Sequence, residues 1–96
     1  MVTHIVFWRL KPEAEGRTNE ENALLIKERL EALVGVIPGL LEMAVGRNVN
    51  GGEYDLALVS KFASMEALEG YAVHPEHQKI SAFVQKVRDA RVAVDF

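Results

Sequence analysis

The stretch Gly70-Tyr71-Ala72-Val73-His74-Pro75-Glu76-His77 decides the organisation of this chain, because it marks a break between two helices. Pro75 lacks an N–H and pushes His74 away from helical angles, so a helix that begins near Ser64 should end here. Proline is favoured as the first residue of a helix, which predicts a second helix from Pro75 to about Arg88. The stretch is therefore a polar corner between two helices.

This corner contains two of the three histidines and one of the two tyrosines of the chain. Tyr71 would end the first helix and His77 would lie in the first turn of the second, so their side chains can be held near one point. That arrangement makes the corner a candidate site. The spacing His-Pro-x-His is not a specific metal or catalytic motif. The alternative stays open that His74 and Pro75 form only a bend and that His77 is a surface residue.

Strand-like and helix-like segments alternate on either side of the corner. Runs rich in β-branched and aromatic residues predict strands over residues 3–11, 40–47, 53–62 and 90–96. Thr18 and Glu21 have the spacing of a capping box, which predicts a helix that ends at Pro38-Gly39. Its inward residues, three or four apart, are Ala23, Ile26, Leu30, Leu33 and Ile37. Residues 12–19 are predicted to be a loop, and Asn50-Gly51 a hairpin turn.

The order of these elements is β-α-β-β-α-β, the arrangement of ferredoxin-like domains. It predicts an α+β fold with a four-stranded antiparallel sheet and both helices on one face of that sheet. A chain of 96 residues is the size of one domain, so residues 1–96 are predicted to form a single unit.

The predicted strands carry apolar side chains on both faces. The more apolar face should meet the helices and comprises Val6, Trp8, Leu10, Leu41, Met43, Val45, Tyr54, Leu56 and Leu58. The opposite face still shows Ile5, Phe7, Ala44, Ala57 and Val59. Because such a patch is unusually apolar for a monomer, we expect a homodimer packed sheet to sheet. His4 shares the face of Val6 and Trp8, so it should line a cavity with Tyr71 and His77; the alternative is a solvated histidine at the rim of the sheet.

Composition excludes several classes of function. The chain has no cysteine, so it has neither a disulfide nor a thiolate nucleophile. A net charge of −3 gives no basic footprint for nucleic acid or an anionic membrane. No apolar run approaches the roughly 20 residues of a membrane span, and the start lacks a basic leader, so a cytoplasmic location is expected.

Several motifs together resemble the stress-responsive α/β-barrel (Dabb) family over essentially the whole chain. They are His4-Ile5-Val6, Leu10-Lys11-Pro12, Ile37-Pro38-Gly39, Tyr54-Asp55-Leu56, Phe62, Tyr71 to His77, and Val94-Asp95-Phe96. The resemblance implies a ferredoxin-like subunit that dimerises through its sheets into an α+β barrel. Most members of the family have no assigned activity.

The chain is also distantly similar to olivetolic acid cyclase, a plant enzyme of this family. That similarity implies that His77 is a general base, that Tyr71 orients the substrate, and that His4 lines the same cavity. A neutral imidazole can take a proton next to a carbonyl, and a phenol can bind the oxygen on which charge develops. No cofactor is implied. The residues expected to contact a small-molecule substrate are His4, Val6, Trp8, Leu56, Leu58, Val73 and His74.

Two departures from the cyclase pattern bear on the cavity. Leu56 replaces a further histidine of the cyclase, and Trp8 adds bulk to the same layer, so a smaller or differently shaped pocket is expected. Some plant relatives hold magnesium through backbone carbonyls at positions that match Val34, Ile37 and Leu40. Backbone ligands leave no side-chain signature, and no metal is predicted here.

The leading hypothesis is a homodimer that binds a small apolar carbonyl or aromatic compound and uses cofactor-independent acid–base catalysis by Tyr71 and His77. One alternative is a non-catalytic, ligand-binding or stress-protective homodimer whose histidines are structural. A further alternative is an enzyme similar to a polyketide cyclase or to a cofactor-free monooxygenase, which rests on analogy of fold. Whether the protein is an enzyme stays open at this point.

Overall fold

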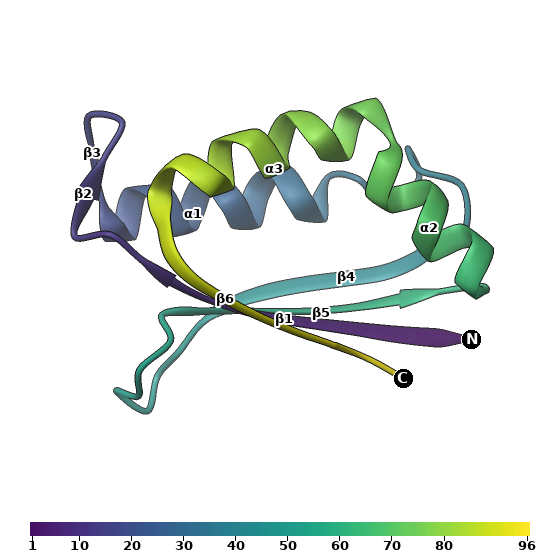
Figure 1. Ribbon diagram of the computed structural model, residues 1–96, viewed down its shortest axis with the longest axis horizontal. Coiled ribbons are helices and arrows are strands. Elements are labelled where there is room, and N and C mark those ends of the chain that lie inside the picture. Colours follow the sequence, from purple (N-terminus) through teal and green to yellow (C-terminus); the bar gives the residue numbers. More distant parts are fainter.

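A four-stranded antiparallel sheet with helices on one face forms the whole fold in a computed structural model that describes residues 1–96 (Figure 1). The elements are β1 (Val2–Leu10), β2 (Glu13–Ala14), β3 (Arg17–Thr18), α1 (Asn19–Glu31), β4 (Leu40–Arg47), β5 (Leu56–Phe62), α2 (Met65–Val73), α3 (Pro75–Val87) and β6 (Arg88–Asp95). The strand order is β4-β5-β1-β6, and every neighbouring pair is antiparallel. The predicted ferredoxin-like α+β fold is confirmed. No helix is both long and apolar enough to span a membrane.

The helices begin at the residues whose side chains can cap them. The capping box is present, because Thr18 Oγ1 accepts the N–H of Glu21 (3.2 Å) and the Glu21 carboxylate accepts the N–H of Thr18 (3.0 Å). Ser64 caps α2. His74 has an extended ψ of 133° and caps α3, with Pro75 as its first residue. The predicted break between two helices is therefore confirmed.

Two loop regions differ from expectation. The helix α1 ends at Glu31 rather than at Pro38-Gly39, and turns follow it. Gly35 has a φ of +88°, which a right-handed helix does not permit. The inward residues Leu33 and Ile37 are still buried. Residues 12–19 are not a plain loop, because β2 and β3 pair as a small hairpin around residues 15 and 16, both of which have positive φ.

Two side chains lie on the face opposite to the predicted one. Leu41 is 48% exposed and Leu40 is buried, because a bulge between Leu40 and Glu42 shifts the register of β4 against β5. Tyr54 precedes β5, which begins three residues later than the strand predicted from residue 53. Its ring packs against Phe7, with ring centroids 6.0 Å apart, on the face away from the helices.

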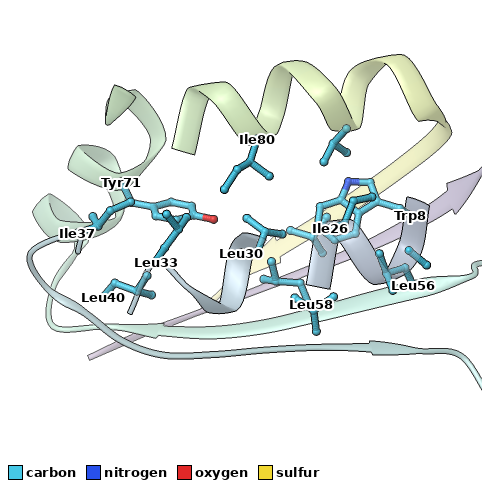
Figure 2. Close-up of a cluster of buried hydrophobic side chains, with 14 of the residues drawn as sticks. Trp8, Ile26, Leu30, Leu33, Ile37, Leu40, Leu56, Leu58, Tyr71 and Ile80 are labelled. Carbon is cyan, nitrogen blue, oxygen red and sulfur yellow. The ribbon is translucent and has the colours of Figure 1, made fainter. Parts of the chain in front are cut away.

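The hydrophobic core lies between the helices and the sheet (Figure 2). Its largest fully buried side chains include Val6, Ile26, Leu56, Leu58, Phe62 and Val87. The helix α3 buries its residues Ile80, Val84 and Val87. This layer forms the surroundings of the candidate site.

The opposite face of the sheet carries no helix (Figure 1). Ile5 pairs with Val59 on β5 and with Val94 on β6, and Phe7 pairs with Val92. Paired residues of antiparallel strands share a face, so these side chains form one continuous apolar surface. Except for the half-buried Ile5, they are substantially exposed in the single chain. We call this surface the open face.

Candidate functional site

A cavity of about 210 Å³ lies between α3 and the sheet, and the three side chains of the predicted site meet on its wall. His4 comes from β1, Tyr71 from α2 and His77 from the first turn of α3. Gln85 and Arg91 are the exposed residues of the wall, so the cavity opens between α3 and β6. An engineered apolar cavity of about 150 Å³ takes a benzene ring, so this one has room for an aromatic ring with a short substituent.

Tyr71 is buried, and its ring packs against those of Phe62 and His77. The ring centroids are 5.0 Å from Phe62 and 4.1 Å from His77. The hydroxyl points along the helix layer toward Ile80 (Figure 2). Burial raises the pKa of the Tyr71 phenol, and the positive charge of Arg91 opposes this only in part. The phenol therefore stays protonated at neutral pH and serves as a hydrogen-bond donor toward the cavity.

His77 is held by the helix break. Its Nδ1 lies 3.4 Å from the carbonyl oxygen of Ala72, so a proton on Nδ1 donates to that oxygen and leaves Nε2 as the basic nitrogen. Burial is the main cause that lowers the pKa of His77, and the contact with Ala72 partly opposes it. Nearby positive charge from His4 and Arg91 lowers the pKa further. The imidazole is therefore neutral at pH values where it would act as a base.

His4 has a partner that the sequence did not reveal. Its Nδ1 pairs with the carboxylate of Asp95, which lies directly opposite in the β1–β6 ladder. The imidazole is almost buried, with its ring centroid 6.4 Å from that of Tyr71. His4 thus lies at the cavity and not as a solvated residue at the rim. Asp95 orients the ring, because its carboxylate binds Nδ1. The other ring nitrogen, Nε2, is not engaged by this contact.

The other expected contact residues divide into two groups. Val6, Trp8 and Leu58 line the cavity. Leu56 is buried in the core opposite Trp8 but does not reach the wall, Val73 is exposed at the end of α2, and His74 is used as the cap of α3. The break thus places His77 inward and His74 away from the cavity.

Four polar residues of the wall were not identified from the sequence. They are Ser81, Gln85, Arg88 and Arg91. Ser81, Gln85 and Arg88 follow His77 at intervals of four, eight and eleven residues, which places them on one side of a helix. That periodicity was available in the sequence. Arg91 reaches the cavity only because β6 pairs with β1, so it had no local signal.

The turn after α1 and the start of β4 contain Val34, Ile37 and Leu40, the positions that match the backbone magnesium ligands of some plant relatives. The carbonyl of Ile37 accepts the N–H of Leu40 at 3.3 Å, so it is engaged within the turn. The chain also has no group of three acidic or histidine side chains that could hold a metal ion. No step of the chemistry considered below uses a metal at this turn.

Comparisons with known proteins agree with this fold. A dimeric protein of unknown function and ferredoxin-like fold from Bacteroides fragilis NCTC 9343 is 31% identical, and the match covers 99% of this chain and 93% of that one with a TM-score of 0.82. A dimeric ferredoxin-like protein of unknown function from Thermobifida fusca YX is 27% identical, with coverage of 99% and 88% and a TM-score of 0.82. A hydroxynitrile lyase from Passiflora edulis is 18% identical, with coverage of 99% and 90% and a TM-score of 0.81, which shows a common fold alone. Among proteins of curated function, none matches the sequence.

The family comparison covers nearly the whole chain. The family described as Stress Responsive A/B Barrel Domain matches residues 2–96, which include every strand and helix described above. The sequence motifs at the helix break, the fold and the family match therefore agree, and the chain belongs to the stress responsive A/B barrel (Dabb) family.

Proposed function

We propose that this protein binds a small, largely apolar carbonyl or aromatic compound in the cavity and acts on it by acid–base chemistry without a cofactor. The observation that carries this proposal is the pairing of Tyr71 and His77 on the wall of the cavity, with ring centroids 4.1 Å apart. Val6, Leu30 and Leu58 supply an apolar floor beneath them. A carbon skeleton would lie on this floor with its carbonyl toward the two polar groups.

The two groups have complementary tasks. Nε2 of His77 takes a proton from the carbon next to the carbonyl, and the electron pair of that C–H bond moves toward the carbonyl oxygen. The Tyr71 hydroxyl donates a hydrogen bond to this oxygen as negative charge develops there. Burial favours both states that the reaction needs, because it keeps His77 neutral and Tyr71 protonated. The proton then returns to carbon, or the enolate carbon attacks a second carbonyl of the same molecule, whose oxygen takes the proton back from His77 as its π bond opens.

The active form that we propose is a homodimer in which two open faces pack together. Solved structures with the same fold include ferredoxin-like proteins described as dimeric. The open face of this chain exposes Phe7, Val59, Val92 and Val94 side by side. Burial of these side chains against a second copy removes apolar surface from water, which favours association. The cavity lies on the other side of the sheet, so each subunit would hold its own site.

Exchange of hydrogen for deuterium tests the proton abstraction without knowledge of the natural substrate. Acetophenone, a small aryl ketone, is incubated with the protein in deuterium oxide, and loss of its methyl signal is followed by proton NMR. The wild-type protein should accelerate this loss, and His77→Gln should reduce the acceleration by about 10²-fold or more, the usual contribution of a general base.

His74→Asn is the matched control for the histidine. Asparagine is a good helix cap, so this variant removes an imidazole three residues away and retains the cap of α3. Its exchange rate should equal that of the wild type. Binding of acetophenone without any exchange would contradict the catalytic proposal and favour a non-catalytic ligand-binding protein. Equal exchange by His77→Gln and the wild type would remove His77 from the reaction.

A further inference from the structure

One end of the cavity carries two arginines and no acid. Arg88 and Arg91 both line the wall, and no aspartate or glutamate does. Neither arginine forms an ion pair within the chain, in contrast to Arg9, which binds both Asp89 and Glu53. The wall of the cavity therefore has an excess of positive charge, although the chain as a whole has a net charge of −3.

A buried donor without a partner lies beside these arginines. The side chain of Trp8 is only 5% exposed, and its indole Nε1 has no hydrogen-bond partner. The indole nitrogen lies on the side of the ring that faces α3 (Figure 2). The Tyr71 hydroxyl points into the same layer, between α3 and the sheet. Native proteins satisfy nearly all of their buried donors, so this orphaned N–H, on a residue that lines the cavity, indicates a missing acceptor.

The β1–β6 ladder places this donor and one of the arginines together. Trp8 and Arg91 are direct partners in the antiparallel register, so their side chains start side by side on the face toward the helices. Arg88 stands at the junction of α3 and β6, directly after Val87, the last residue of the helix that carries His77. Trp8, Arg88 and Arg91 thus start from neighbouring positions of the β1–β6 ladder, and all three line the cavity.

We propose that the natural ligand of this cavity carries a carboxylate, which Arg91, Arg88 and the indole N–H of Trp8 bind at the β6 end. This inference rests on the proposed function and adds its substrate class: a small aromatic or apolar carbonyl compound with an acid group. A guanidinium matches a carboxylate with two parallel hydrogen bonds, and the indole N–H supplies a further donor.

The two ends of the cavity then hold different parts of one molecule. His4 and Trp8 are four residues apart on β1, so their Cα atoms are separated by about 13 Å along the strand. The side chain of Arg91 spans part of this distance, because its charge acts on both Tyr71 and His77. The acid would lie near Trp8 and Arg91, and the carbonyl near Tyr71 and His77. The anion therefore fixes the direction in which the molecule lies.

A rigid pair of probes separates charge from shape. In 4-acetylbenzoate an acetyl group and a carboxylate lie at opposite ends of one ring, and 4-acetylbenzamide has nearly the same shape without the charge. Binding is followed by the fluorescence of Trp8, the one tryptophan of the chain, and checked by calorimetry. The acid should bind at least about tenfold more tightly than the amide at low salt, and added salt should reduce that advantage.

Two arginine variants locate the binding of the anion. In Arg91→Gln and in Arg88→Gln the acid should lose most of its advantage over the amide, and continued binding of the amide reports that the cavity is intact. Arg47→Gln is the matched control, because Arg47 lies on the surface near Glu20 and outside the cavity. That variant should keep the full preference for the acid.

The outcomes distinguish this inference from the function on which it rests. If acid and amide bind equally well, and both depend on Tyr71 and His77, then the anion site is wrong and the proposed function stands. A preference for the acid that survives in both arginine variants would also overturn the anion site. If neither probe nor acetophenone binds, the proposed function fails, and the substrate class fails with it.

Discussion

The ring of Tyr71 lies against the imidazole of His77, with centroids 4.1 Å apart and planes inclined by 33°. The two residues come from different helices, α2 and α3, and meet because the chain breaks at His74 and Pro75 between them. Phe62 also packs against the tyrosine ring, with a centroid distance of 5.0 Å. The contact therefore has a structural part, the stacked rings, and a chemical part, the hydroxyl and the imidazole nitrogen.

The substitution Tyr71→Phe separates these two parts. Phenylalanine keeps the ring contacts and removes only the hydroxyl. This hydroxyl is desolvated in the folded chain, since burial is the main cause that raises its pKa. We expect the free energy of unfolding to change by less than about 1 kcal/mol, because no protein hydrogen bond of the hydroxyl is lost. Exchange of the acetophenone methyl protons should fall by about 10²-fold, the effect of removing one donor to a developing oxyanion.

Tyr54→Phe is the control for this prediction, because Tyr54 packs on Phe7 at the open face and not at the cavity. It should leave the exchange rate unchanged. Thermal denaturation and proton NMR give the two measurements for both variants. A loss of stability well above 1 kcal/mol in Tyr71→Phe, with normal exchange, would show that the hydroxyl is structural.

The pKa of His77 should lie below the ordinary histidine value of about 6.5. Burial is its main cause, and nearby positive charge from His4 and Arg91 acts in the same direction. The unfolded chain then binds more protons than the folded one as pH falls, so the neutral imidazole contributes stability above about pH 6.5 that is lost as pH falls through the folded pKa. Titration of the His77 ring signals by NMR measures this value.

The pH dependence of stability provides a second measurement. Substitution of His77 by glutamine should flatten the decline of stability below about pH 6.5, because the group that takes up protons on unfolding is gone. The variant His74→Asn should retain more of this decline in stability than His77→Gln does. A folded pKa of His77 at or above the ordinary value would contradict the burial that is inferred for this side chain.

Local features of the sequence predicted most of the fold, because their causes are local. Pro75 specifies the break wherever it stands, and Thr18 with Glu21 specifies the start of α1. The bulge at Leu41 had no such signal, because it depends on the register of β4 against β5. Leu40 and Leu41 are both leucines, so either could face the helices. The alternation of apolar and polar residues therefore could not show which of the two is buried.

The residues of the candidate site also form two groups, those that local spacing predicted and those that strand pairing brings in. Tyr71 and His77 lie next to the break, so the sequence places them together. Asp95 and Arg91 reach the site through the pairing of β6 with β1, more than eighty residues away along the chain. A register of this kind is set by the whole sheet and by the apolar faces that it buries. The anionic and cationic partners of the site were for that reason not predictable from local spacing.

Gly39 should be far more sensitive to substitution than Gly35. Both have positive φ, +80° and +88°, so alanine at either position is strained. A Cβ on Gly39 would lie 2.5 Å from the Cβ of Ala67, whereas a Cβ on Gly35 would meet nothing within 4 Å. We expect Gly35→Ala to cost about 1 kcal/mol of unfolding free energy and Gly39→Ala about 3 kcal/mol, the scale of strain plus overpacking.

Chemical denaturation of both variants measures this difference. The contact of Gly39 with Ala67 joins the turn before β4 to α2, so Gly39→Ala in an Ala67→Gly background should recover the part of the loss that comes from the clash. Equal losses in the two single variants would indicate that α2 does not pack closely on this turn.

Glu31 and Lys27 protect the edge of the sheet. The strand β4 is an edge strand, and its Val45 donates an N–H to the Glu31 carboxylate (3.0 Å) and accepts from Lys27 Nζ (2.8 Å). The hydrogen bond from Lys27 is the largest cause that lowers the pKa of Glu31, followed by that from Val45. Glu31→Gln should reduce stability by about 1 kcal/mol, a value kept small because the side chain is one-third exposed.

This loss should depend on pH in a defined direction. A carboxylate whose pKa is lowered on folding contributes stability above its unfolded pKa of about 4.3, and the contribution is lost as pH falls through the folded value. The difference between Glu31→Gln and the wild type should therefore vanish in acid. Glu28→Gln, on the exposed side of the same helix, should show no such difference at any pH. A pH-independent loss in Glu31→Gln would mean that the charge of Glu31 does not matter.

A lysine in the middle of the open face should separate the proposed dimer. Val59 lies on β5 between Ile5 and Ala44 of the flanking strands and is 42% exposed in the single chain. The wild type should sediment as a dimer at micromolar concentration, and Val59→Lys as a folded monomer with unchanged circular dichroism. The reason is that a two-fold interface contains each substituted residue twice, so two like charges would have to be buried together without partners.

Val49→Lys adds the same charge at a position that is 97% exposed in the loop before β5. It should remain a dimer, since a loop side chain in water is not desolvated by contact between two sheets. A wild-type protein that sediments as a monomer at micromolar concentration would contradict the proposed interface, because Phe7, Val59, Val92 and Val94 would then face water. Such a result would leave the cavity untouched, since its wall is built by α1, α2, α3 and the other face of the sheet. The subunit would then have to tolerate an apolar surface that soluble monomers rarely expose.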